Sequence, residues 1–247
     1  MSAPEGADGT HTAGDGGTTI EGTLYARWQP PPPEALTPRR LELRRLGDSL
    51  REVIDRLVST DAPVEQITAA ADQLERIAAE FEHVANASVY EGFAEATIAG
   101  SDVGALFDQS PFIGRANPLA PPIRIWEDGG QVAGEVVFGA AYEGPPGCVH
   151  GGYIAGAFDE VLGATQTLSG RPGMTGTLTT VYRSPTPLHT PLRFRGWITG
   201  TERRKILTAA TLHAGETLCA EATAVFISID IEVFARLREE REARRGT

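Results

Sequence analysis

The sequence has little cysteine and no clustered metal ligands. Its two cysteines, Cys148 and Cys219, lie far apart in the chain and form neither a paired metal-ligand spacing nor a redox spacing, so we expect two reduced thiols. The histidines likewise form no metal-ligand cluster. These absences point to no metal site, and we expect the protein to work without a cofactor.

Long apolar runs and an excess of positive charge are also missing. No apolar run reaches the roughly 18 residues of a membrane-spanning helix, and the N-terminus lacks the charged-then-apolar pattern of a signal peptide. With 22 Lys and Arg against 33 Asp and Glu, the formal net charge is −11, whereas nucleic acids and anionic membranes require a basic surface. We therefore expect a cytoplasmic protein with no nucleic-acid partner and no stable membrane insertion.

The most informative stretch is residues 146–156, which contains His150-Gly151-Gly152 and is followed by Asp159. The first N–H groups of a helix have no partner within it and carry the positive end of its dipole, so the two glycines offer open donors for an oxyanion. Asp159 lies about 13 Å further along the axis. If both features are catalytic, the site joins two subunits across a two-fold axis. The helix is predicted to begin near His150 because apolar residues then follow at helical spacing: Ile154, Phe158, Val161, Leu162, Thr165 and Leu168.

Five separate pieces of sequence carry a family resemblance: residues 143–152, Asp159, Met174-Thr175, residues 182–188 and Arg204-Lys205. In order and spacing they resemble the hotdog-fold acyl-CoA thioesterases, in particular the phenylacetic-acid-pathway and human thioesterase-superfamily type. The resemblance implies an α+β hotdog fold, with a long central helix wrapped by an antiparallel β-sheet. It also implies an acyl-CoA substrate and a homodimer or dimer of dimers.

The resemblance assigns roles to the residues around the helix start. Thioester hydrolysis needs donors for the developing negative charge, a base or nucleophile, and a grip on the thiol. The N–H of Gly151 or Gly152 is expected to polarise the carbonyl, with His150 fixing the loop or the sulfur side. Asp159 is expected to activate water or to attack directly, and Thr175 to orient the water.

Glu160 is the carboxylate that competes with Asp159. Adjacent helix positions point about 100° apart, so the two carboxylates face different directions. The family spacing selects Asp159, and we interpret Glu160 as a surface charge.

Basic residues are the candidates for binding coenzyme A, because its phosphates are bound well by Arg and Lys. Arg203, Arg204 and Lys205 lie together between two predicted strands, and Arg183 precedes a proline-rich turn. Asn117, from the long segment before the first strand, is a further candidate. We expect these five residues to bind the substrate.

Composition and periodicity divide the chain into five segments. Apolar residues recur at helical spacing from Leu43 and again after Asp61-Ala62-Pro63, which predicts an N-terminal αα-hairpin. We interpret this hairpin as a packing element; clamping on the core, covering an acyl channel and mediating oligomerisation are its other possible roles. The segments are a disordered tail and Pro-rich connector (1–33, with Pro38 continuing the extended chain), the hairpin extension (34–85), a connector or lid (86–121), the hotdog domain (122–230) and a C-terminal helix (231–247).

The hotdog segment shows the alternation of β-strands on both sides of the central helix. A hairpin is predicted around Asp128-Gly129-Gly130, and four more strands at 175–182, 192–199, 205–213 and 217–229. Leu192, Phe194 and Ile198 are expected to share one face of their strand, and Leu218, Ala220, Ala222, Ala224 and Phe226 one face of theirs. Periodicity alone supports an α+β fold with the helix on one sheet face.

The sequence lacks the motifs that two other enzyme classes require. His-Gly-Gly also occurs in α/β-hydrolases, but no Gly-x-Ser-x-Gly elbow follows. Hotdog hydratases carry Asp-x-x-x-x-His on the central helix, and no histidine follows Asp159 before His189. The remaining alternative is a non-catalytic hotdog dimer that binds acyl-CoA or acts as a scaffold. The joint presence of His150, Asp159 and Thr175 favours the enzyme.

Overall fold

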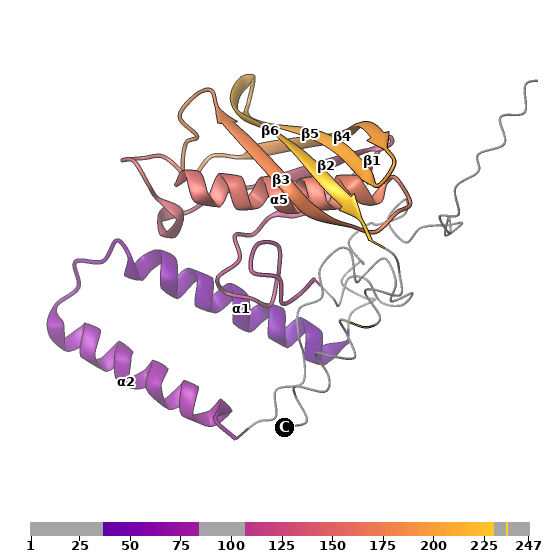
Figure 1. The fold of residues 1–247 in the computed structure, drawn as a ribbon. Helices are drawn as coiled ribbons and strands as arrows, with labels where there is room; N and C mark the ends of the chain where they lie inside the picture. Colours follow the sequence, from indigo (N-terminus) through magenta and orange to yellow (C-terminus); the bar gives the residue numbers. More distant parts are fainter. Residues whose placement is uncertain (1–36, 84–106, 230–235, 237–247) are drawn as a thin grey trace, which may run out of the picture.

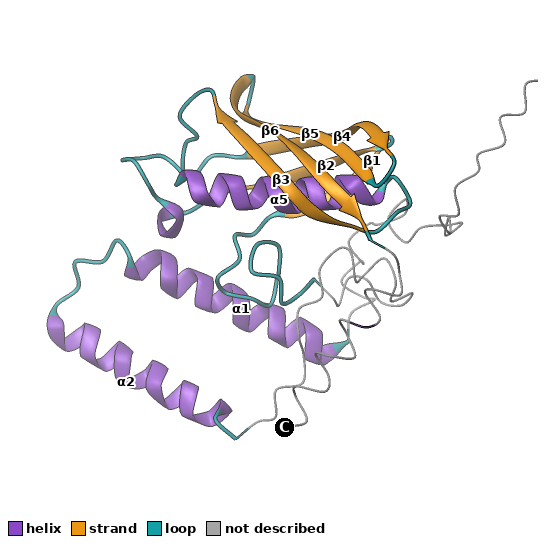
Figure 2. Ribbon diagram, viewed as in Figure 1, coloured by secondary structure: helices purple, strands orange, loops and turns teal. Residues whose placement is uncertain are grey.

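The computed structural model describes residues 37–83, 107–229 and 236 (Figure 1). Within these residues, two N-terminal helices precede a six-stranded sheet, and one long helix lies between its second and third strands in the sequence (Figure 2). The predicted tail and Pro-rich connector, residues 86–106 of the predicted lid, and the C-terminal helix apart from residue 236 lie outside the described residues.

The sheet is antiparallel throughout, in the order β1-β2-β4-β5-β6-β3. The predicted first hairpin is confirmed: Gly129 and Gly130 form its turn with φ of 61° and 77°, values that glycine adopts without steric cost. The strands are β1 Arg124–Asp128, β2 Gln131–Val136, β3 Gly173–Tyr182, β4 Leu192–Glu202, β5 Lys205–Ala214 and β6 Thr217–Ser228.

Helix α5, Gly151–Thr167, packs along the inner face of this sheet (Figure 1). Its apolar stripe is buried against the strands, and Phe158 meets Phe194 edge to face with ring centroids 5.3 Å apart. Gly196 permits this close approach, since a Cβ there would lie 2.4 Å from Oγ1 of Thr165. The expected α+β arrangement, one long helix wrapped by an antiparallel sheet, is confirmed.

One predicted strand face is wrong at its first residue. Ala220 pairs with Leu212 and faces the core, but Leu218 pairs with His213, so Cys219 is an extra residue in a β-bulge. A bulge changes which side of the strand the preceding residue faces. Leu218 therefore lies on the outer side, and Cys219 is buried.

The N-terminal part forms the two predicted helices, α1 Pro38–Leu57 and α2 Val64–Phe81. Thr37 caps α1 by accepting a hydrogen bond from the N–H of Arg40, and Pro38 occupies the first helical turn, where proline is favoured. Pro38 thus begins a helix instead of continuing the extended connector. Helix α1 lies between the sheet domain and α2, and α2 has no buried residue (Figure 1). None of the described helices is long and apolar enough to cross a membrane.

Candidate functional site

The start of α5 lies as predicted, with His150 as its N-cap. His150 Nδ1 accepts a hydrogen bond from the N–H of Gly152 over 3.0 Å, and the N–H groups of Tyr153 and Ile154 both reach the carbonyl of His150. Within the described residues the N–H of Gly151 has no acceptor. Of the two candidate glycines, Gly151 therefore has its donor available.

The loop before α5 is held tightly, which fixes the direction of the Gly151 N–H. The N–H of His150 donates to the carbonyl of Tyr142 over 2.8 Å, and that of Val149 to the carbonyl of Thr186 over 2.8 Å. Gly144 passes so close to His150 that a Cβ would lie 2.7 Å from its Cα. An oxyanion donor must be pre-positioned to stabilise charge, and this loop provides such rigidity.

Asp159 and Thr175 are brought together away from the helix start. The hydroxyl of Thr175 donates to Oδ1 of Asp159 over 2.9 Å, linking α5 to β3. Asp159 lies eight residues after Gly151, which is about 12 Å along the helix axis. A single chain thus holds the Asp159 carboxylate and the Gly151 N–H at separate places.

Glu160 is not the free surface charge that the sequence suggested. Its side chain is half-buried, and its Oε1 accepts a hydrogen bond from the hydroxyl of Ser110 over 3.3 Å. Ser110 is fully buried in the segment before β1. Glu160 therefore binds that segment to α5, on a different side of the helix from Thr175.

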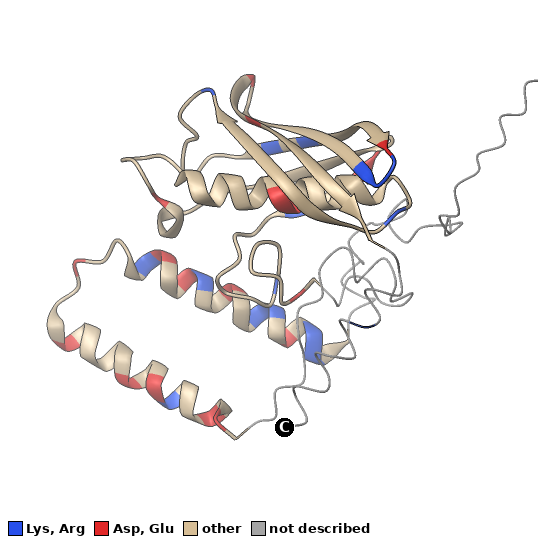
Figure 3. Cartoon of the chain, viewed as in Figure 1, with Lys and Arg blue, Asp and Glu red and all other residues tan. Residues whose placement is uncertain are grey.

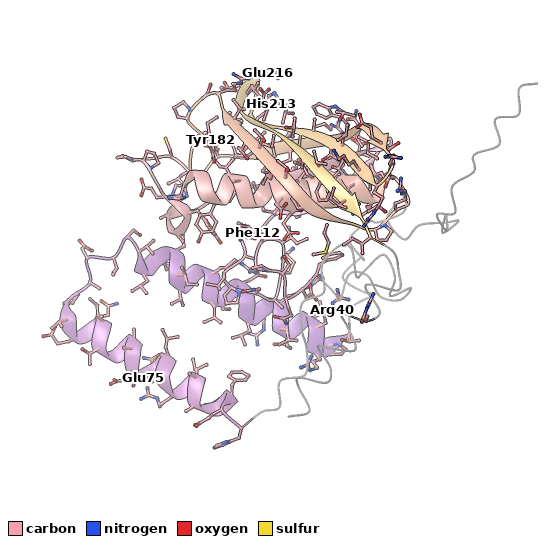
Figure 4. All side chains as sticks on the ribbon, in the orientation of Figure 1. Arg40, Glu75, Phe112, Tyr182, His213 and Glu216 are labelled. Atoms are coloured by element: carbon pink, nitrogen blue, oxygen red, sulfur yellow. The ribbon has the colours of Figure 1, made fainter. Side chains whose placement is uncertain are left out.

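Tyr182 is a site residue that the sequence analysis did not single out. Its hydroxyl donates to the carbonyl of Gly151 over 2.8 Å, from the end of β3 that lies beside the start of α5 (Figure 4). The sequence did offer one signal for Tyr182, since it is the first residue of 182–188, one of the five pieces that carry the family resemblance. A cavity of about 410 Å³ opens here, lined by Pro145, Cys148, Val149, Gly151, Ile154, Tyr182, Arg183, Ser184, Pro185 and Thr186.

The candidate basic residues lie at opposite ends of α5 within one chain. Arg183 lines the cavity and forms an ion pair with Glu221. Arg203 and Arg204 form the β4–β5 turn, next to the segment that follows the C-terminal end of α5. The Arg203 carbonyl accepts a hydrogen bond from Arg171 in that segment over 2.7 Å. Nε of Arg204 donates to the carbonyl of Ser228 over 3.1 Å. Lys205 follows as the first, exposed residue of β5.

Asn117 has a local role in the segment before β1. Its amide nitrogen donates to the carbonyl of Gln109 over 3.1 Å, and its amide oxygen accepts from the N–H of Leu119 over 3.0 Å. Among the described residues, Asn117 forms no hydrogen bond with another candidate site residue. The described hydrogen bonds of Asn117 thus stabilise its own segment and link it to α1 through Arg51, and none joins it to Gly151 or Asp159.

The described residues contain no group of three His, Cys, Asp or Glu side chains that would hold a metal ion. Cys148 and Cys219 are both free thiols.

No protein-family model matches the chain. The solved crystal structure of RHA08564, a thioesterase superfamily protein, is 33% identical with a TM-score of 0.66, covering 75% of this chain and 94% of that one. Acyl-coenzyme A thioesterase THEM4 of Xenopus laevis is 37% identical over 93 residues, and that of Mus musculus 36% over 96 residues. These matches cover 37% and 38% of this chain, which spans 42% and 41% of those two relatives.

Proposed function

This chain belongs to the thioesterase superfamily and has its hotdog fold, and we propose that it hydrolyses acyl-CoA thioesters to a free acid and coenzyme A. The observation that carries the proposal is that the chain holds both a Thr175-bound Asp159 and, at a helix N-terminus, a Gly151 N–H with no acceptor among the described residues. The names of the curated relatives agree with this substrate class.

We propose that the two halves of the site meet through β3. Among the described strands β3 forms one edge of the sheet, and Gly173–Tyr182 contains no charged residue (Figure 3). An unpaired, uncharged edge strand is a template for pairing with another chain. Antiparallel pairing of two β3 strands about a two-fold axis at Thr179, with Gly176 as the extra residue of a β-bulge, places Thr175 of one subunit opposite Tyr182 of the partner subunit. Asp159 of one subunit then faces Gly151 of the partner subunit, which supplies the contact that a single chain lacks.

In this composite site the Gly151 N–H donates to the thioester carbonyl oxygen and stabilises the negative charge that develops there, helped by the helix dipole. The Asp159 carboxylate of the other subunit, held by Thr175, removes a proton from a water molecule. The resulting hydroxide adds to the carbonyl carbon, the C–S bond breaks, and the thiolate of coenzyme A takes up the proton.

Direct attack by Asp159 on the carbonyl carbon is the competing route, and it passes through a mixed anhydride that water then opens. A single turnover in ¹⁸O-labelled water tests for the anhydride. Label in the Asp159 side chain arises only when water attacks the aspartyl carbonyl, so it establishes the anhydride route. General-base catalysis leaves Asp159 unlabelled, as does water attack on the substrate carbonyl of an anhydride.

The same two-fold arrangement supports a role for both groups of basic residues. Gly173, close to the Arg203-Arg204 turn, lies at the opposite end of β3 from Tyr182 and Arg183. Pairing of two β3 strands brings the Arg203–Lys205 cluster of one subunit towards the cavity lined by Arg183 of the partner subunit. Both groups then contribute positive charge near one cavity mouth, where the phosphates of coenzyme A would bind.

The test is release of free thiol from acetyl-, benzoyl- and palmitoyl-CoA, with Asp159→Asn as the matched inactive control. We expect turnover of at least one ester by the wild-type protein and its loss in Asp159→Asn. Calorimetric binding of these esters by a folded protein that releases no thiol would overturn the proposal and favour a non-catalytic acyl-CoA-binding dimer.

A further inference from the structure

The segment 107–118 contacts α5 beside the proposed reaction centre. A Cβ built on Gly156 would lie 2.2 Å from the ring of Phe112, so the Phe112 ring occupies the space of an absent side chain. Gly156 is three residues before Asp159, and positions three apart on a helix have Cβ atoms about 5–6 Å apart. The Phe112 ring therefore lies about one helical turn from the proposed base, between α5 and α1 (Figure 4).

Phe112 also reaches the first turn of α5 through a row of aromatic rings. Its ring meets that of Tyr153 with centroids 6.5 Å apart, and Tyr153 meets Tyr142 edge to face at 4.9 Å. Tyr153 is two residues after Gly151. Phe112 and Tyr153 thus form a row of two aromatic rings along α5, from its first turn towards Asp159, and both side chains are partly exposed.

Polar contacts hold this row in place from the α5 side. The hydroxyl of Ser110 accepts hydrogen bonds from the N–H groups of Phe112 and Ile113 over 3.2 and 3.1 Å, and it donates to Glu160. The backbone around Phe112 is therefore anchored to α5 at Glu160, one turn beyond Gly156.

Helix α1 holds the same segment from the other side. Asp108 forms ion pairs with Arg40 and Arg44, whose side chains are only 11% and 19% exposed. Arg51 donates to the carbonyls of Arg115 and Asn117, each over 2.7 Å. Charged hydrogen bonds of this kind, shielded from water, are among the stronger polar contacts.

We propose that residues 107–118 form one wall of the acyl-binding cleft and that Phe112 limits the length of the acyl chain accepted. The proposal rests on the proposed thioesterase function. Gly152 and Ala155 carry no side chain larger than a methyl group, and the Phe112 ring covers Gly156, so an acyl chain that runs along this face of α5 from the carbonyl carbon meets the Phe112 ring. Contact with such a ring stabilises a bound apolar chain in proportion to the apolar area that is buried.

The test compares chain-length profiles of kcat/KM, from acetyl- to palmitoyl-CoA, for the wild type, Phe112→Ala, the milder Phe112→Leu and the control Leu119→Ala. Leu119 lies just beyond the same segment and is 67% exposed. Discrimination in an apolar pocket changes about tenfold or more per methylene-sized contact, so we expect Phe112→Ala to raise the ratio of long-chain to short-chain kcat/KM by roughly tenfold or more. Phe112→Leu should shift it less and Leu119→Ala not at all.

A second variant keeps the proposal testable if Phe112→Ala folds poorly. Gly156→Ala adds a methyl group where the ring now lies and must displace it, which should change the chain-length profile without deleting Phe112. Folded variants whose profiles match the wild type would overturn the role of Phe112 while leaving the thioesterase intact. A wild-type protein that cleaves no ester would instead remove the proposed function.

Discussion

The hydroxyl of Thr175 donates to Oδ1 of Asp159 over 2.9 Å, joining the edge strand β3 to the central helix. Oδ2 of Asp159 has no hydrogen-bond donor among the described residues. That oxygen is therefore the one available to a substrate water, and its direction is fixed by Thr175. The strand proposed to bind the partner subunit thus also orients the proposed base.

Asp159→Asn should lower kcat by roughly 10² to 10⁴, the range that acid–base groups typically supply, with KM little changed. The substitution keeps the shape and the Thr175 contact but removes the base. Thr175→Ala should cost less, because water can replace its hydrogen bond. Steady-state kinetics on the best ester measure these effects.

Glu160→Gln is the matched control for this prediction, because the amide can still accept from Ser110. We expect nearly wild-type kcat. A crippled Glu160→Gln together with an active Asp159→Asn would reverse the assignment of the two carboxylates.

Gly151→Pro should remove the oxyanion donor with little damage to α5. Gly151 is the first helical residue, where proline is favoured, and His150 has the extended conformation that a following proline requires. Gly151→Ala is the control: it adds a similar Cβ contact with Tyr182, 3.1 Å from its hydroxyl, but retains the N–H. We expect kcat to fall by roughly 10² to 10³ in Gly151→Pro relative to Gly151→Ala.

Purified heterodimers of Gly151→Pro and Asp159→Ala chains test whether the site is shared. One of the two composite sites then carries both changes and the other carries neither, so activity should return to about half that of the wild-type dimer. Heterodimers without activity would show that Gly151 and Asp159 of the same chain work together.

Thr179→Lys should separate the subunits. Thr179 is exposed near the middle of β3, so two-fold pairing would bring two lysines close together, and like charges opposite one another destabilise strand pairing. Sedimentation velocity should show a shift to monomer, accompanied by loss of turnover. Thr201→Lys on β4, away from this edge, should change neither; a fully active Thr179→Lys monomer would contradict the composite site.

The stability of the protein should fall as pH rises from about 10 to about 12. Burial raises the pKa of Tyr142 to about 12, although the positive charge of Arg51 opposes this, whereas an unfolded tyrosine titrates near 10. Between these values the folded state binds the proton more tightly, so deprotonation favours unfolding. Urea denaturation across this range should show a smaller decline for Tyr142→Phe than for the wild type; equal declines would contradict the assignment.

Signals within short stretches of sequence predicted the central helix and its surroundings well. The apolar stripe and the glycines after His150 predicted that the helix begins near His150, and the resemblance assigned Asp159 and Thr175 to one reaction centre. The first prediction depends on helix periodicity among residues close in sequence. The second depends on the family fold, which places α5 beside β3. The choice between Gly151 and Gly152, however, depends on the orientation of the His150 ring, which sequence does not encode in any pattern.

Contacts made by the segment before β1 were beyond prediction for a different reason. Ser110 and Glu160 are 50 residues apart, and the segment has no periodicity to indicate which of its residues face α5. The role of Glu160 was therefore misassigned, and the contact between Phe112 and Gly156 was not foreseen. The bulge at Cys219 similarly follows from sheet pairing and not from the alternation of apolar residues.

The exposed edge of β3 also affects how chains associate before the proposed dimer forms. The run Thr177–Tyr182 has strong β-propensity and lacks charge and proline, features typical of segments that form amyloid-like aggregates. In a newly synthesised, unpaired chain this strand is open to indiscriminate association, so the yield of native protein should depend on how quickly chains encounter each other correctly. The same lysine at position 179 that abolishes catalysis should therefore increase the fraction recovered in soluble form.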